Sequence, residues 1–196
     1  QYTQAIRGFA ARLTFSEAKL LRMNSAVKSV EPDRVIRVEG EQLSPTWGLD
    51  RLDQNSLPLN SRYSYQGSGS GVTAYVVDTG IDSTLSELGG RVRLGRPATG
   101  AQDCDGHGTH VAGTIGSSSY GVAKNVSLVS VRVLDCSGSG SYATIIAGLD
   151  WIVSDHVVGV KAVANMSLGG ASFSALNSAV DRVINDGIVM TVAAGN

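Results

Sequence analysis

The chain has 196 residues, of which 42% are hydrophobic, and a formal net charge of −1. This length suits one domain, or one domain with a small appendage, and the apolar share is sufficient for a buried core. The near-neutral charge gives no electrostatic reason to expect nucleic acid or an anionic membrane as a partner. No stretch reaches the roughly 18 consecutive apolar residues that a membrane helix needs, so no membrane segment is expected.

The first 39 residues predict a small α+β unit. Residues 5–15 alternate loosely between apolar and polar positions, which favours a strand, and Ser16 is a possible N-cap for a helix that ends at Met23. Residues 27–38 predict two extended pieces around a turn at Glu31-Pro32-Asp33. A unit of this size would be only marginally stable by itself.

The next stretch predicts loops. Residues 40–45 read as a linker, Trp47 begins a new segment, and the Gly-Ser repeat at residues 67–71 predicts a flexible turn, because a phosphate-binding loop would follow a strand and this one precedes it. Between them lie four oxygen-bearing side chains, those of Asp50, Asp53, Gln54 and Asn60. Such side chains can bind calcium, or they can cap turns on a solvated face.

Beyond residue 71 the pattern predicts alternating strands and helices. Apolar runs predict strands at residues 72–77, 128–134, 162–168 and 188–194. Helices are expected at residues 107–116, from a cap at Ser141 to Val153, and at residues 174–186. Continuously apolar strands that alternate with helices predict an α/β fold, with a parallel sheet that is covered by helices on both faces. Ligands of such sheets bind beyond the carboxyl ends of the strands.

Three polar residues are expected near that edge. His107 lies between two glycines at the start of a helix, where neighbouring chain can approach closely and the helix N-terminus favours a neutral imidazole. Asp78 follows the strand at residues 72–77, and Asn196 follows the last strand. A buried carboxylate can orient a base, and a carboxamide can stabilise an oxyanion by roughly 3–4 kcal/mol. The three residues together predict acyl transfer.

Three stretches carry a resemblance to a known family. They are Ala74-Tyr75-Val76-Val77-Asp78-Thr79-Gly80-Ile81, Asp105-Gly106-His107-Gly108-Thr109-His110-Val111-Ala112-Gly113-Thr114-Ile115, and Val192-Ala193-Ala194-Gly195-Asn196. They resemble the subtilisin-like serine peptidases, in the proteinase K branch and nearest to its aqualysin-type bacterial members. The resemblance implies that Asp78 is the orienting acid, His107 the general base and Asn196 the oxyanion donor, whereas His110 would be structural.

The resemblance also implies a substrate cleft. Two segments would bind an extended peptide through their backbones, a tyrosine would line an apolar subsite, and a third segment would form the wall next to the scissile bond. The two peptide-binding segments are Gly138, Ser139 and Gly140, and Ser167, Leu168 and Gly169. The tyrosine is Tyr142, and the wall next to the scissile bond is formed by Ala193, Ala194 and Gly195.

The resemblance further divides the chain into a partial inhibitor-like propeptide, residues 1–39, and a partial peptidase domain, residues 40–196. Self-cleavage would fall near residues 39–42. Composition alone leaves Cys104 and Cys136 as two buried thiols or as one disulfide, and the resemblance pairs them. It also assigns the oxygen-bearing loop to a structural calcium ion, although Arg62 stands where another oxygen ligand would be expected.

The family's nucleophile lies in a Gly-Thr-Ser-Met-Ala motif, and these 196 residues do not contain that motif. We therefore interpret the chain as a fragment of the precursor of a secreted, monomeric endopeptidase. It lacks the C-terminal third of the domain and is expected to be inactive by itself. Protein and peptide substrates, and the protein's own propeptide, are the implied partners, and no organic cofactor is expected.

Two other interpretations were open. A metal hydrolase could use His107 and His110 with Asp103 or Asp105, although zinc proteases usually carry a general base such as the glutamate of His-Glu-x-x-His. A pseudo-peptidase or peptide-binding module could hold peptide in the same cleft without cleaving it. Inhibition by a serine-directed reagent but not by a zinc chelator would distinguish a serine peptidase from the metal hydrolase. A serine at the nucleophile position would distinguish a peptidase from the pseudo-peptidase.

Overall fold

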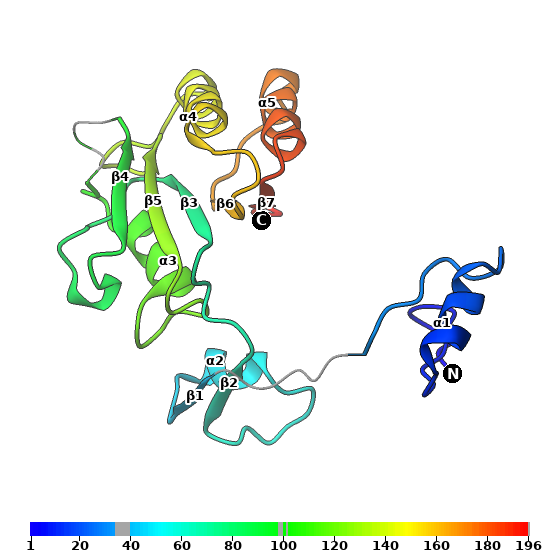
Figure 1. Cartoon of the computed structure of the whole chain (residues 1–196). Helices are drawn as coiled ribbons and strands as arrows, with labels where there is room; N and C mark the ends of the chain where they lie inside the picture. The colour runs from blue at the N-terminus through cyan, green and yellow to red at the C-terminus, as the bar shows by residue number, and fades with distance from the viewer. Residues whose placement is uncertain (34–39, 98–99, 101, 196) are drawn as a thin grey trace. The chain divides into compact units, whose positions relative to one another are not determined.

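The computed structural model describes residues 1–33, 40–97, 100 and 102–195, and the chain forms two compact units, Gln1–Arg37 and Val38–Asn196 (Figure 1). In the first unit the helix α1 spans Phe15–Arg22. Its cap is Thr14 and not Ser16, because Thr14 and Glu17 form a reciprocal capping box. Within the part of the chain that is described, no helix is long and apolar enough to cross a membrane.

The strand predicted at residues 5–15 is wrong. The structure has only an isolated bridge between Tyr2 and Gly8, and side chains such as Ile6 and Phe9 are exposed. A strand needs a neighbouring strand for its backbone hydrogen bonds, and the described residues of this unit supply none. No strand forms at residues 27–33 either, and residues 34–38 of that predicted element lie outside the described residues.

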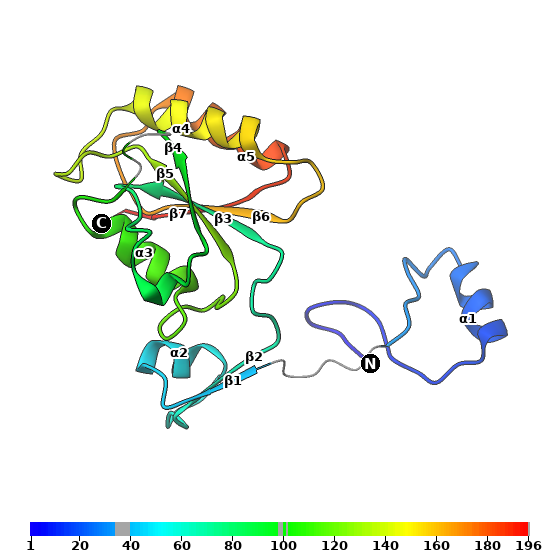
Figure 2. The same ribbon diagram turned by 60° about the vertical axis from the view of Figure 1, so that its left-hand side comes forward.

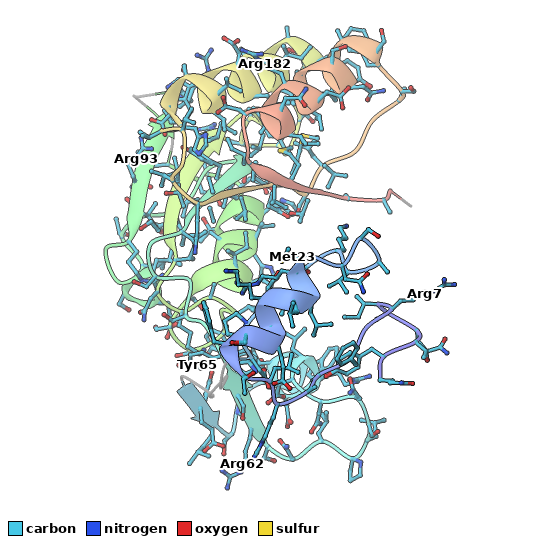
Figure 3. The ribbon with its side chains drawn as sticks, turned by 45° about the vertical axis from the view of Figure 1, so that its right-hand side comes forward. Arg7, Met23, Arg62, Tyr65, Arg93 and Arg182 are labelled. Carbon is cyan, nitrogen blue, oxygen red and sulfur yellow. A yellow bond between two sulfur atoms is a disulfide. The ribbon has the colours of Figure 1, made fainter. Side chains whose placement is uncertain are left out.

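The second unit begins with a small antiparallel sheet. Strand β1 (Gly40–Leu43) pairs with β2 (Arg62–Tyr65), and helix α2 (Trp47–Leu52) lies between them in the chain. The linker predicted at residues 40–45 is therefore wrong. Glu41 forms an ion pair with Arg62, and a Cβ at Gly40 would lie 2.3 Å from the Tyr65 ring, so a larger residue there would displace the Tyr65 side chain. Figure 3 labels Arg62 and Tyr65 at the two ends of β2.

A five-stranded parallel sheet forms the rest of this unit, with strand order β4-β5-β3-β6-β7. Its strands are β3 (Thr73–Asp78), β4 (Val92–Arg96), β5 (Ser127–Arg132), β6 (Ala162–Met166) and β7 (Val189–Val192). The connecting helices are η1 (Ser86–Leu88, a 3-10 turn), α3 (His107–Gly116), α4 (Tyr142–Asp155) and α5 (Ser174–Asn185). Sequence reasoning missed β4, which is an edge strand.

Helices cover both faces of the sheet, as predicted. Figures 1 and 2 show α4 and α5 side by side on one face and α3 on the other. On the α4 and α5 side, Leu149 and Val183 pack against residues of β3 and β5 in one buried cluster. On the α3 side, Ala112 packs against a second cluster that includes Val76 and Leu128. Because all five strands are parallel, the residues that follow them lie at the same edge of the sheet.

Candidate active site

Asp78 is the last residue of β3, and its side chain is completely buried. Its Oδ1 atom accepts a hydrogen bond from the Thr79 N–H at 2.7 Å and lies 2.7 Å from Nδ1 of His107. Since a carboxylate oxygen can only accept, Nδ1 carries the proton of the imidazole. The lone pair is then on Nε2, and the His107 side chain is 50% exposed. The arrangement is that of a base held by a buried carboxylate.

Two glycines allow α3 to begin this close to the end of β3. A Cβ at Gly108 would lie 2.2 Å from the backbone oxygen of Gly80, so any side chain would push the helix away. Gly106 has a φ of 108°, a backbone conformation that residues with a side chain rarely adopt, and it forms the turn that leads into the helix. The close approach expected around His107 is therefore present.

The hydrogen bond that His107 donates to Asp78 raises the pKa of His107 above its ordinary value, and burial, which acts in the opposite direction, is the smaller effect. The net shift is opposite to the one expected from the helix N-terminus alone. The adjacent carboxylate outweighs the helix dipole because it is a full charge at hydrogen-bonding distance. A carboxylate in this position would stabilise an imidazolium if the ring accepted a proton.

The segment that follows β5 is an exposed turn. Asp135 Oδ1 accepts hydrogen bonds from the backbone N–H groups of Ser137 and Ser139, and Gly138 has a φ of 73°. Gly138, Ser139 and Gly140 are all exposed. The structure thus places these residues beside the carboxyl end of β5, in a turn whose backbone groups at Gly138 and Ser139 bond to Asp135, and no strand forms among the described residues here.

The second expected peptide-binding segment follows β6. That strand ends at Met166, so Ser167, Leu168 and Gly169 lie just beyond it. The hydroxyl of Ser167 accepts a hydrogen bond from the side-chain amide of Asn165. Further along, the N–H of Ala193 donates to the Met166 carbonyl, and Ala193, Ala194 and Gly195 are exposed. Asn196 lies outside the described residues.

Tyr142 connects the two loop regions. It begins α4, its hydroxyl donates to the Ala171 carbonyl at 2.8 Å, and its ring stacks on Phe173 with centroids 4.5 Å apart. The aromatic pair thus joins the start of α4 to the segment before α5. Sequence reasoning did not single out Phe173, and its only signal was an apolar residue immediately before a helix.

A disulfide between Cys104 and Cys136, with an S–S distance of 2.08 Å, joins the loop before α3 to the turn after β5. This is the pairing that the resemblance implied. Arg132 lies beside the bridge and donates to the carbonyls of Gly100, Gln102 and Leu134. The loop that leads to His107 is thereby held against the loop after β5.

The metal-hydrolase interpretation gains no support. Both oxygens of Asp103 accept hydrogen bonds from the loop and the helix start, and the His110 side chain is exposed on α3. Among the residues that the structure describes, no three His, Cys, Asp or Glu side chains are grouped so that they could hold a metal ion.

Three of the four expected calcium ligands, Asp50, Asp53 and Asn60, cap a turn, whereas the side-chain nitrogen of Gln54 is buried without a hydrogen-bond partner among the described residues. The two oxygens of Asp50, which is 4% exposed, accept from the N–H groups of Asn60 and Ser61. Asp53 accepts from the N–H of Ser64, and the side chain of Asn60 accepts from the N–H of Arg62. Each of these oxygens keeps a second lone pair, so the donor set is compatible with calcium and also with capping alone.

Comparison with known proteins places the chain in a family. The Subtilase family model matches residues 69–196, and the model of the peptidase inhibitor I9 matches residues 1–39. The chain is 52% identical to an extracellular serine proteinase of Thermus sp. (strain Rt41A), over 100% of the chain and 48% of that protein. It is 40% identical to Proteinase R of Parengyodontium album, over 100% of the chain and 51% of that protein.

A solved structure agrees with these matches. The crystal structure of a cold-adapted subtilisin-like serine proteinase superposes with a TM-score of 0.74 and 51% identity, covering 78% of this chain and 57% of that one. The chain thus spans about half the length of the relatives it matches. The chain belongs to the subtilase family of serine peptidases, in the branch of the proteinase K-like enzymes.

Proposed function

We propose that this chain is part of the precursor of a secreted serine endopeptidase, in which Asp78 and His107 act with a serine nucleophile and Asn196 stabilises the oxyanion. The observation that carries the proposal is the 2.7 Å contact between the buried Asp78 carboxylate and the His107 ring. It leaves Nε2 of a half-exposed imidazole as the proton acceptor. Subtilase membership and the extracellular serine proteinase of Thermus support the reaction class and the secreted location.

In the proposed reaction, Nε2 of His107 takes the proton of the serine hydroxyl while its oxygen attacks the carbonyl carbon of the peptide bond. The C–N bond then breaks as the same proton passes to the leaving amine, and water releases the acyl group by the reverse sequence. Asp78 stabilises the imidazolium throughout, and the Asn196 carboxamide donates to the oxyanion. The Gly-Thr-Ser-Met-Ala motif does not occur in these 196 residues, so we expect them to be inactive by themselves.

The substrate is proposed to be an extended peptide. The backbone of the exposed residues 138–140 on one side and of residues 167–169, of which only Gly169 is exposed, on the other would add strand-like hydrogen bonds to it. The stacked pair of Tyr142 and Phe173 would line a subsite for an apolar side chain. Ala193, Ala194 and Gly195, whose side chains are small or absent, would form the wall of the pocket next to the scissile bond.

Residues 1–39 are proposed to be the matching inhibitory propeptide, because the inhibitor model matches this range. Cleavage between the propeptide and the peptidase domain would leave β1 in place. Gly40 to Leu43 is paired with β2 and the Gln42 side chain donates to the Ser119 carbonyl, and these contacts support placing this segment with the peptidase domain. A monomer is sufficient for all of these roles.

Hydrolysis of a chromogenic peptide by the full-length protein tests the proposal. We expect activity that a serine-directed fluorophosphonate abolishes and that 1,10-phenanthroline, a zinc chelator, leaves unchanged. Inhibition by the chelator alone would indicate a metal hydrolase. Binding of the peptide without turnover, together with no labelling by the fluorophosphonate, would indicate a pseudo-peptidase and would overturn the proposal.

A further inference from the structure

The first turn of α3 is capped by side chains from outside the helix. Its N-cap, Gly106, has no side chain, yet the first three N–H groups of the helix all have partners. His107 donates to Asp105 Oδ1 at 3.1 Å, Gly108 to Thr79 Oγ1 at 2.9 Å, and Thr109 to Asp103 Oδ2 at 2.9 Å. An ordinary cap satisfies one or two of these groups from the N-cap residue itself.

Thr79 is the unusual member of this cap because it lies just after the end of β3, outside the loop that leads to the helix. It directly follows Asp78, is completely buried, and donates its N–H to Asp78 Oδ1. Its hydroxyl accepts from the N–H of Gly108 and donates to Asp103 Oδ1 at 2.9 Å. One side chain therefore bonds to the helix and to the loop before it, while its backbone bonds to the carboxylate that holds the base.

Asp103 completes the connection. Oδ1 accepts from the Thr79 hydroxyl and from the N–H groups of Asp105 and Gly106, and Oδ2 accepts from the N–H and the hydroxyl of Thr109. Burial opposes the ionisation of this carboxyl, but the hydrogen bonds outweigh it and lower its pKa well below the usual range. Asp103 is therefore an anion across the neutral range, and it faces the N-terminus of α3, where negative charge is stabilising.

We propose that Thr79 and Asp103 are positioning residues that set the distance between the acid and the base of this active site. The inference rests on the proposed function. The Asp78–His107 bond joins two side chains, one of them half exposed, whereas the Thr79 and Asp103 bonds join β3, the preceding loop and the α3 backbone. The spacing of those backbones determines where the imidazole can lie.

Four variants of the full-length protein test this role. Thr79→Val removes the hydroxyl at nearly constant volume, Thr79→Ser keeps it, and Asp103→Asn removes the charge. Thr114→Val is the matched control, because Thr114 is exposed on the same helix and its hydroxyl bonds only to the His110 carbonyl among the described residues. The readouts are kcat, KM, the pH profile of kcat/KM, and the NMR signal of the His107 Nδ1 proton.

For Thr79→Val we expect kcat to fall about 10- to 100-fold with KM within about twofold, because a misplaced base costs turnover more than binding. The acid limb of its kcat/KM profile should move to lower pH as the Asp78 bond weakens. Thr79→Ser should recover kcat to within about threefold, Asp103→Asn should resemble Thr79→Val, and Thr114→Val should match the wild type. Unchanged kcat and acid limb in folded Thr79→Val would overturn the inference, as would equal losses in Thr79→Ser.

The NMR signal separates this inference from the proposed function because it needs no turnover. The Nδ1 proton of His107 should shift upfield or broaden in Thr79→Val and in Asp103→Asn, and it should stay in place in Thr114→Val. An inactive wild-type protein would refute the peptidase proposal, while this signal would still decide the positioning role. If Thr79→Val does not fold, Asp103→Asn and Thr79→Ser give the decision, and an unmoved signal in folded Asp103→Asn counts against the inference.

Discussion

Nδ1 of His107 lies 2.7 Å from Oδ1 of Asp78, although 29 positions separate the two residues in the sequence. The contact exists because β3 ends where α3 begins, and because Gly108 lets the helix approach the chain at Gly80. A completely buried carboxylate thereby meets an imidazole that is half exposed. The pKa of that imidazole and the proposed chemistry both depend on this contact.

Asp78→Asn tests the electrostatic side of the contact. The full-length variant should lose about 10⁴-fold in kcat, because an amide no longer stabilises the imidazolium or selects the tautomer. The pKa of His107 should fall, because the hydrogen bond that raises it is gone. The acid limb of kcat/KM, expected above pH 6.5 in the wild type, should then move to lower pH. Asp181→Asn, an exposed aspartate on α5, is the charge-matched control, and an unmoved acid limb in Asp78→Asn would contradict the account.

Gly108→Ala tests the close approach of helix and strand. The new Cβ would lie 2.2 Å from the Gly80 oxygen, so the variant should be destabilised by about 1–3 kcal/mol in urea unfolding. Gly113→Ala on the same helix is the matched control, since no atom other than those of its chain neighbours and of the nearby helix backbone lies within 4 Å of its Cβ position. Alanine favours a helix over glycine, so this second variant should gain about 0.5–1 kcal/mol. Equal changes in the two variants would show that the contact at Gly108 is not tight.

His156 should make the stability of the α4–α5 pair depend on pH. Its Nδ1 contacts Asp186 at 2.7 Å and its Nε2 contacts the Val160 carbonyl at 2.9 Å, and both partners can only accept. The side chain is 3% exposed, and its pKa is raised by the hydrogen bonds to Val160 and Asp186, with a further contribution from the charge of Asp155. The geometry therefore calls for an imidazolium that donates from both nitrogens.

Because the folded pKa of His156 lies above its ordinary value of 6.5, the stabilisation is fully present below about pH 6.5 and is lost as the pH rises through the folded pKa. His156→Gln should therefore lower the melting temperature more at pH 6 than at pH 9. His110→Gln, at an exposed position, serves as the control. A difference between wild type and His156→Gln that grows toward alkaline pH would contradict this sign.

Calcium removal tests the loop after α2. If the loop binds calcium, EGTA should lower the melting temperature of the full-length protein, and Asp53→Asn should reduce this response, because Asp53 is exposed and keeps a free lone pair beside its bond to Ser64. Glu41→Gln, which removes an exposed carboxylate from β1, is the control. If EGTA lowered the melting temperature of Asp53→Asn as much as that of the wild type, calcium binding by this loop would be contradicted, and its side chains would only cap the turn.

The parallel sheet was predictable because its central strands are mainly apolar: β3 is apolar from Ala74 to Val77, and β5 is interrupted only by Ser130 between Leu128 and Val131. The edge strand β4 was missed because Arg93 and Arg96 interrupt its apolar pattern, and an edge position allows such charges to face solvent. Residues 5–15 show the opposite error. Their alternation is compatible with a strand, but a strand also depends on a partner that local sequence does not specify.

The candidate site, like the fold, was predictable only in part. The proximity of Asp78 and His107 was predictable, because a strand end and a helix start converge at the carboxyl edge of a parallel sheet. The direction of the His107 pKa shift was not, since it depends on a 2.7 Å contact rather than on the helix end. The role of Thr79 also escaped prediction, because its partners Gly108 and Asp103 become neighbours only when the loop folds back on β3.

The most direct test compares His107→Ala with His110→Ala in the full-length protein, because the two histidines lie on the same helix and only His107 contacts Asp78. Measured as kcat/KM on a peptide substrate, His107→Ala should lose about 10⁴-fold or more, and His110→Ala should stay within a few-fold of the wild type. Equal losses in the two variants, or full activity in His107→Ala, would contradict the assignment of His107 as the base of a serine peptidase.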